Sequence, residues 1–193
     1  PETQYDYKAS QGLIQPGLKF KVIDDDGNEV PWNGEDMGEI LLRGPWIADE
    51  YYEEPEQSAE AFQDNWYHTE DVVTVDEEGY INLVDRKKDL VKSGGEWISS
   101  VEIENALIAH HKVEEATVVG VDHPKWQERP LAMVARTDES LTEEDVTQYL
   151  SEQEFPEWWI PDAIVFVDEI PKTSTGKYDK KTVRDEYDDY LMG

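Results

Sequence analysis

Residues 66–100, WYHTEDVVTVDEEGYINLVDRKKDLVKSGGEWISS, carry the densest pattern of structural signals in this chain of 193 residues. Runs rich in β-branched and aromatic residues at Val72–Asp76 and Tyr80–Val84 predict two strands, joined by the turn sequence Glu-Glu-Gly. The polar cluster Tyr67–Asp71 is expected to precede the first strand as a turn. The basic cluster Arg86–Lys87–Lys88 comes directly after the second strand.

A glycine-bearing segment and a helix start follow the basic cluster. Lys92–Gly95 is expected to form a flexible loop, and the serine pair predicts a helix that begins at Ser99 or Ser100. Backbone amides of a glycine loop and of a helix N-terminus attract anions, so this order of elements suggests an anion site. A hairpin followed by a capped helix, without a ligand, is the alternative interpretation.

Negative charge dominates the composition, with 46 acidic against 17 basic residues and a formal net charge of -29. Such self-repulsion destabilises a compact state, and molar salt relieves it by shortening the Debye length to about 3 Å. A salt-adapted, halophilic source is therefore the first explanation. Calcium binding and nucleic-acid mimicry are the alternatives. Asp24–Asn28 lacks the downstream ligands of a calcium loop, and the sign of the charge disfavours binding to nucleic-acid phosphates.

The chain contains no cysteine, so no disulfide framework is expected, which fits a reducing, cytoplasmic location. No apolar run is long enough to suggest a membrane span. The sequence opens on PETQYDYKAS without an initiator methionine, and we expect it to be a segment of a longer protein.

The first 86 residues predict a β-rich unit. Residues 1–17 show little periodicity and are expected to be irregular. Leu18–Ile23 alternates apolar and basic residues like a half-buried strand, and Asp26–Gly27 is a hairpin turn signal. Glu39–Arg43 predicts another strand, and a short helix is expected from Pro55 to Phe62.

Residues 87–193 predict a compact unit in which helices and strands alternate, so the fold class is α+β. A capped helix over 101–110 is expected to place Val101, Leu107 and Ile108 on one face. Buried strands are predicted at 115–121, 130–136 and 163–167. Thr142 is expected to cap a helix that reaches about Glu152, and a last helix is expected over about 180–190. Residues 171–177, PKTSTGK, form a loop with almost no apolar residue.

Three places could carry chemistry on residue type alone. A carboxylate in Tyr67–Asp71 could accept hydrogen bonds from two adjacent hydroxyls, as a ribose offers, although a turn is favoured on spacing alone. Arg86 suits a phosphate or paired hydroxyls. The alternative is that Arg86 belongs to a solvated basic patch without a ligand. Lys177 could reach a phosphate or carboxylate, but the spacing of a Walker phosphate loop is not met. No histidine or cysteine motif predicts a metal site.

Taken in order, five motifs resemble one family. They are Tyr-x-Thr-x-Asp (67–71), Asp-Arg-x-Lys-Asp (85–89), Ser-Gly-Gly-Glu-Trp (93–97), Glu-x-Glu (102–104) and Pro-Lys-Thr-x-x-Gly-Lys (171–177). The chain is similar to the C-terminal part of the adenylate-forming superfamily, which includes acyl-CoA synthetases, luciferases and adenylation domains of peptide synthetases. Glu-Trp-Ile-Ser-Ser (96–100) and His-Pro-Lys-Trp (123–126) resemble medium-chain fatty-acid–CoA ligases and methylmercaptopropionate–CoA ligases.

The resemblance implies that ATP activates a carboxylic acid as acyl-AMP and that CoA then displaces AMP, with Mg²⁺ assisting. It implies that residues 1–86 end a large adenylating domain and that 87–193 form a small mobile lid domain. Asp71 and Arg86 would bind the nucleotide, Lys177 would be catalytic in the first step, and Lys88 would be the hinge. The CoA channel would be lined by Ser93, Gly94, Gly95, Glu96 and Trp97, with Trp126 a further candidate.

The sequence departs from the family pattern at Glu70, where glycine is usual. The phosphate-binding loop and the acyl pocket also lie outside the motifs present, so the segment alone is expected to be inactive. Two alternatives stay open: an aryl- or amino-acid-adenylating enzyme with a carrier-protein acceptor, and a non-catalytic acidic binding module of the same fold. The expected partners are a fatty acid, ATP and CoA, without nucleic acid, and homo-oligomer formation is left open.

Overall fold

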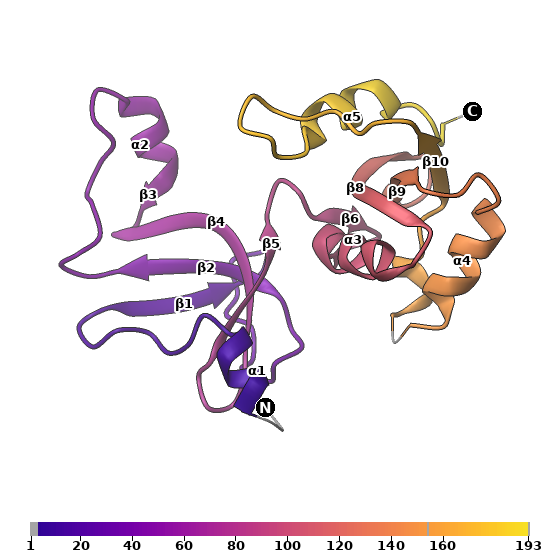
Figure 1. The fold of residues 1–193 in the computed structure, drawn as a ribbon. Helices are drawn as coiled ribbons and strands as arrows, with labels where there is room; N and C mark the ends of the chain where they lie inside the picture. The colour runs from indigo at the N-terminus through magenta and orange to yellow at the C-terminus, as the bar shows by residue number, and fades with distance from the viewer. Residues whose placement is uncertain (1–3, 154, 193) are drawn as a thin grey trace. The chain divides into compact units, whose positions relative to one another are not determined.

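The computed structural model describes residues 4–153 and 155–192, the side chains of 4–6 excepted. It divides the chain into two compact units, Pro1–Lys88 and Asp89–Gly193, coloured indigo to magenta and magenta to yellow (Figure 1). Each unit is built on its own sheet. The architecture is of the α+β class that the sequence predicts.

Within the described residues, the sheet of the first unit has five antiparallel strands. They are β1 (Lys19–Ile23), β2 (Gly38–Arg43), β3 (Phe62–Gln63), β4 (Trp66–Val75) and β5 (Ile81–Arg86). The order is β1-β2-β4-β3, and β5 also pairs with β4. The core consists of branched side chains that alternate along the strands, namely Val22, Ile40, Val73, Val75 and Ile81. Two short helices, α1 (Gln4–Ala9) and α2 (Pro55–Ala61), complete the unit.

The described part of the second unit has a mixed sheet in the order β10-β9-β6-β7, with β8 also paired to β9. Its strands are β6 (Val91–Ser93), β7 (Glu96–Ile98), β8 (Val113–His123), β9 (Gln127–Arg136) and β10 (Ala163–Val167). β10 runs parallel to β9 and the other pairs are antiparallel. The helices are α3 (Ser100–Ala109), α4 (Glu143–Ser151), the 3-10 turn η1 (Glu157–Trp159) and α5 (Lys180–Tyr187).

The core of the second unit lies on the two long strands β8 and β9. Residues 116–121 and 131–135 are buried without interruption, as expected of strands that are covered on both faces. α3 and α5 both pack against β8, and Val183 of α5 joins Val119 and Val121 in one apolar cluster. Burial of such continuous apolar runs is the main stabilising contribution to this unit.

Side-chain caps fix the starts of two helices where the sequence predicted them. The Ser99 Oγ accepts the Glu102 amide at 3.2 Å, and α3 begins at Ser100. At α4, Thr142 and Asp145 form a complete capping box. Each cap satisfies backbone amides that the helix itself cannot bond, which contributes about 1 kcal/mol.

The expectation of a flexible loop at Lys92–Gly95 is wrong. Lys92 and Ser93 belong to β6, where they pair with Trp97 and Glu96 of β7, and Gly94–Gly95 form the two-residue turn between the strands. Both glycines have positive φ, 62° and 94°. A two-residue hairpin turn requires such angles at both positions, so the glycine pair marks a defined turn and not a mobile segment.

Three other local expectations are also wrong. The cluster Tyr67–Asp71 lies inside β4, because β4 starts at Trp66. The N-terminal residues that were expected to be irregular contain α1. Ile108 is 45% exposed, since α3 buries residues 100, 103, 104 and 107, a stripe that includes the serine Ser100 and the acid Glu104.

Among the described residues, none of the helices has the length and apolar character needed to cross a membrane.

Exposed acids occur in runs in both units, for example Glu53–Glu54 and Glu143–Asp145. Raising KCl from about 0.1 M to about 1 M shortens the Debye length from about 10 Å to about 3 Å and should raise the unfolding temperature, measured by circular dichroism. Sucrose is the control, because it strengthens apolar burial without screening charge. An equal gain in sucrose, or no gain in KCl, would contradict the prediction.

Candidate functional site

Two of the predicted site residues, Asp71 and Arg86, lie opposite each other on β4 and β5. They are register partners, and the Arg86 Nε lies 3.4 Å from the Asp71 Oδ1. Their side chains are 35% and 60% exposed, and an exposed pair of this kind contributes only about 0–1 kcal/mol to stability. Both groups are therefore accessible to a ligand: the carboxylate can accept from hydroxyl groups, and the guanidinium can donate to an anion.

The backbone before Asp71 has an unusual conformation. The Thr69 Oγ1 donates to the Ile40 carbonyl at 2.7 Å and accepts the Asp71 amide at 3.1 Å. Between them, Glu70 has a φ of 59°, in the left-handed region, where a residue with a Cβ costs about 1–2 kcal/mol. Glycine adopts this φ readily, so the glycine that the resemblance leads us to expect here would take the same backbone conformation at lower cost. Glu70 changes the charge but keeps the backbone shape.

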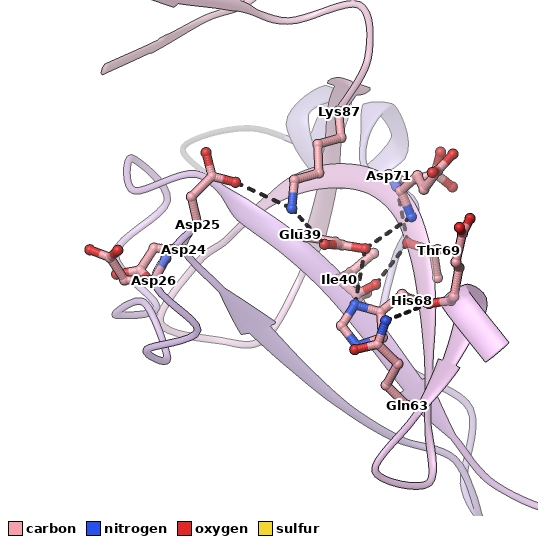
Figure 2. Close-up of polar contacts among 12 residues, drawn as sticks. Asp24, Asp25, Asp26, Glu39, Ile40, Gln63, His68, Thr69, Asp71 and Lys87 are labelled. Atoms are coloured by element: carbon pink, nitrogen blue, oxygen red, sulfur yellow. Dashed lines mark hydrogen bonds and ion pairs between the residues drawn. The ribbon is translucent and has the colours of Figure 1, made fainter. Parts of the chain in front are cut away.

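A buried carboxylate, that of Glu39 on β2, fixes this segment, as Figure 2 shows. Its side chain is 4% exposed. Its Oε1 accepts the Glu70 amide at 3.2 Å and lies 3.5 Å from the His68 Nδ1, while its Oε2 accepts the Lys87 Nζ at 3.0 Å. A buried carboxylate requires such partners. Glu39 thereby connects the residue before Asp71 to the residue after the end of β5.

Lys87 anchors the end of the first unit. Its Nζ also lies 3.2 Å from the Asp25 Oδ1, and its amide donates to the Glu70 carbonyl at 2.8 Å. Burial alone would lower the pKa of Lys87, but the hydrogen bonds and charges of Glu39 and Asp25 outweigh burial and raise the pKa above 10.5. The contribution of the charged Lys87 side chain to the stability of the folded state is thus fully present below pH 10.5. It is lost as the pH rises through the raised pKa of Lys87. Lys88, the predicted hinge, is the last residue of this unit.

An open pocket of about 390 Å³ lies beside the Glu39 carboxylate. The Tyr51 and Tyr67 hydroxyls in its wall are 3.1 Å apart, and this hydrogen bond, with burial and neighbouring acids, raises the pKa of Tyr67 to about 12. The Tyr67 hydroxyl therefore stays protonated at neutral pH. The other lining residues are mostly polar: Glu39, Gln57, Glu60, Ala61, His68, Thr69, Glu70 and Lys87.

The residues predicted to line a CoA channel, Ser93–Trp97, form the tip of the β6–β7 hairpin in the second unit. Ser93 is buried, and the two glycines are exposed. Trp126 lies against this tip: its carbonyl accepts the Gly94 amide at 2.8 Å, and a Cβ on Gly94 would stand 3.0 Å from its ring. The structure thus brings all of these predicted residues together.

Two lysines lie over aromatic rings at this hairpin. The Lys125 Nζ is 4.1 Å from the Trp126 ring centroid, and the Lys92 Nζ is 5.7 Å from that of Trp97. Such contacts contribute about 0.5–1 kcal/mol each at exposed sites. Trp126 is itself 41% exposed. Exposed aromatic surface beside positive charge suits an anionic nucleotide.

Lys177 lies in the second unit, in a turn between β10 and α5, and so in a different unit from Asp71 and Arg86. The turn is closed by hydrogen bonds from the Thr173 amide to the Lys177 carbonyl at 2.8 Å and from the Gly176 amide to the Thr173 carbonyl at 2.9 Å. The Lys177 side chain is exposed. In the part of the chain that the structure describes, no acidic side chain pairs with it.

The sequence did not predict that four charged residues, Glu39, Asp85, Glu104 and Arg129, are buried. The Glu104 Oε1 accepts the Val118 amide at 2.7 Å and lies 2.9 Å from the Lys180 Nζ, which ties α3 to the helix that begins three residues after Lys177. A signal was available, since Glu39 starts an otherwise apolar run and Glu104 falls on the buried stripe of its helix. No group of three or more His, Asp or Glu residues among those described could hold a metal ion.

Comparison with known proteins identifies relatives along the whole chain. Residues 102–177 match the AMP-binding enzyme C-terminal domain. The chain is 47% identical to the long-chain-fatty-acid–CoA ligase of Thermus thermophilus, 43% to the 3-methylmercaptopropionyl-CoA ligase of Ruegeria lacuscaerulensis and 38% to the medium-chain-fatty-acid–CoA ligase of Ectopseudomonas oleovorans. In each case all of this chain aligns, but it spans only 36%, 35% and 35% of the relative's length.

Solved structures of related enzymes are also similar to this chain. ATP-bound MatB from Rhodopseudomonas palustris is 31% identical, with a TM-score of 0.80 over 95% of this chain and 36% of that chain. The o-succinylbenzoate CoA synthetase of Bacillus subtilis, in complex with its acyl-adenylate intermediate, is 28% identical, with a TM-score of 0.80 over 95% of this chain and 37% of that chain. The fold is therefore that of the C-terminal part of such enzymes.

The φ of Glu70 generates a prediction. Glu70→Gly should raise the free energy of unfolding by about 0.5–1 kcal/mol, because the left-handed cost of about 1–2 kcal/mol exceeds the added chain entropy of glycine. Glu70→Ala removes the charge but keeps the Cβ, so it should give little gain. The free energy of unfolding of each variant is measured by chemical denaturation.

Glu77→Gly is the matched control, since Glu77 is an exposed acid in the turn that follows β4 and does not have a positive φ. It should lower stability. Equal gains from Glu70→Gly and Glu70→Ala would show that charge, and not backbone conformation, is responsible.

Proposed function

Since residues 102–177 belong to the AMP-binding enzyme C-terminal domain family and the relatives of the chain are acyl-CoA ligases of the adenylate-forming superfamily, we propose that the chain is the C-terminal part of an ATP-dependent, AMP-forming fatty-acid–CoA ligase. The first unit is then the end of the large adenylating domain, and the second unit is the small mobile domain. The observation that carries the proposal is the exposed register pair of Asp71 and Arg86, which fits a ribose and its phosphate.

In the first step, the fatty-acid carboxylate attacks the α-phosphate of ATP, an acyl-AMP forms and pyrophosphate leaves. Asp71 accepts hydrogen bonds from the ribose hydroxyls, and Arg86 donates to the ribose or phosphate. Lys177 would act on the carboxylate and the α-phosphate, where a fixed cation stabilises the negative charge that grows in the transition state. The unpaired state of the Lys177 side chain among the described residues supports this role.

In the second step, the CoA thiol attacks the acyl carbonyl, the thioester forms and AMP leaves. The Ser93–Trp97 hairpin and Trp126 line the path of CoA. Lys88 is the hinge at which the second unit turns between the steps, as a few linker residues do in domain closure. Mg²⁺ would neutralise charge on the ATP phosphates in the full-length enzyme; this chain spans 36% of the length of the Thermus thermophilus relative. The working environment that fits the charge of -29 is a salt-rich cytoplasm.

The experiment that tests the function uses the full-length protein in about 1 M KCl with ATP, CoA and a panel of carboxylic acids. Release of AMP together with thioester formation from fatty acids is the expected result. Acyl-adenylate without thioester would indicate a carrier-protein acceptor, as in amino-acid-adenylating enzymes. No AMP with any acid would leave a non-catalytic acidic module.

Lys177→Ala should slow acyl-adenylate formation by about 10²–10³, the usual effect of losing one preorganised group that stabilises a transition state. Thioester formation from preformed acyl-AMP should change little. Lys181→Ala is the matched control, since Lys181 is an 85% exposed lysine four residues away that pairs with Asp185. Equal losses in both half-reactions would contradict the role of Lys177.

A further inference from the structure

Arg129 of β9 is a buried arginine in the second unit, 8% exposed. Its Nε and Nη2 donate to the Asp162 Oδ1 at 2.9 and 2.6 Å. Its Nη1 donates to the Ser93 Oγ at 3.1 Å and to the Trp158 carbonyl at 2.7 Å, and its Nη2 also donates to the Ile160 carbonyl at 3.2 Å. These five hydrogen bonds use all five donors of the guanidinium.

The hairpin tip is held by a few backbone contacts, which include the Gly94 amide to the Trp126 carbonyl, and by side chains. Within the described residues, the backbone ladder between β6 and β9 consists of the single pair Ser93–Gln127. The Lys92 amide donates to a side chain of β9, the Glu128 carboxylate, at 2.9 Å. The Arg129–Ser93 bond is a second side-chain tie and the more buried one, since Ser93 is 6% exposed.

The backbone at the junction is strained. Gln127 has a φ of 75°, and a non-glycine residue keeps such a conformation only where the surroundings fix it. Gln127 follows Trp126, whose carbonyl accepts the Gly94 amide. Arg129 lies two residues further along β9. Arg129 therefore fixes the strand beside the strained residue as well as the hairpin opposite.

We propose that Arg129 is a positioning residue for the CoA-dependent half of the reaction. The inference rests on the proposed function of the hairpin. The bonds of Arg129 lead to Ser93 at the base of the hairpin and to residues 158–162, and none leads to the Lys177 turn at 171–177. Loss of Arg129 should therefore disturb thioester formation and spare acyl-adenylate formation.

Arg129→Lys in the full-length enzyme tests this separation. Lysine keeps the charge opposite Asp162 but lacks the planar fork with five donors. The KM for CoA should rise about tenfold, the effect of losing one hydrogen bond to a charged group. ATP–pyrophosphate exchange without CoA should stay unchanged.

Arg136→Lys is the matched control. Arg136 is also an arginine of β9, but it donates to the Leu141 carbonyl at 2.6 Å and lies 4.2 Å from the Phe166 ring, away from the hairpin. It should leave both half-reactions unchanged. If Arg129→Lys does not fold, Asp162→Asn, which weakens the same guanidinium contact, should raise the KM for CoA by a smaller factor.

Equal losses in both half-reactions, an unchanged KM for CoA, or the same rise with Arg136→Lys would overturn the inference. If the wild-type enzyme forms no acyl-adenylate, the proposed function fails and the role in catalysis falls with it. Amide hydrogen exchange then tests the positioning itself: exchange in 91–98 should accelerate with Arg129→Lys and not with Arg136→Lys. Unchanged exchange in 91–98 would overturn the positioning role independently of activity.

Discussion

The pair formed by the Glu39 carboxylate and the Lys87 ammonium is the contact on which the candidate nucleotide site depends. One oxygen of Glu39 holds the backbone just before Asp71, and the other holds the side chain just after Arg86. Removing Lys87 would leave the Glu39 carboxylate, 4% exposed, without its cation, which costs far more than the net stability that the intact pair provides. The backbone on both sides of the exposed pair Asp71–Arg86 is thus held by a contact in the wall of the neighbouring pocket.

A similar arrangement occurs in the second unit with the charges reversed. There a buried cation, Arg129, holds the hairpin proposed for CoA, and the pair of Glu104 and Lys180 holds the start of the helix that follows Lys177. Four of the cations of this acidic chain therefore illustrate two roles. Arg129 and Lys180, like Lys87 in the first unit, are paired with carboxylates and fix the backbone, whereas Lys177 is exposed at a proposed ligand site.

The sequence predicted the parts of the structure that depend on local pattern. Alternation in β1, the apolar runs of β8 and β9, and the caps at Ser99 and Thr142 are all local signals, and the structure confirms them. The glycine pair at 94–95 was interpreted as flexibility although two consecutive positive φ angles are what a short hairpin turn requires.

The burial of these charged residues was not predicted for a different reason. Charged residues make up 33% of the chain, so an acid or an arginine in a strand is most simply interpreted as part of its solvent face. Their partners lie 48 residues away for Glu39 and Lys87 and 36 residues away for Arg129 and Ser93. A local pattern carries no information about such pairs, whereas the motif resemblance proposed Asp71 and Arg86 without any knowledge of contacts.

So acidic a chain repels an anionic ligand. The sequence reduces this electrostatic repulsion near Lys92 and Lys177. Residues 90–95 and 170–178, which contain Lys92 and Lys177, have no acid. Glu70 is the exception, since it is exposed and directly precedes Asp71. Its charge would act on a bound phosphate over the Debye length of about 10 Å at 0.1 M salt, but hardly over about 3 Å at 1 M. The net charge of -29 and the glutamate at position 70 would therefore be tolerated under the same physical condition, a short screening length. Under that condition the left-handed backbone, and not the charge, is what the site requires of this position.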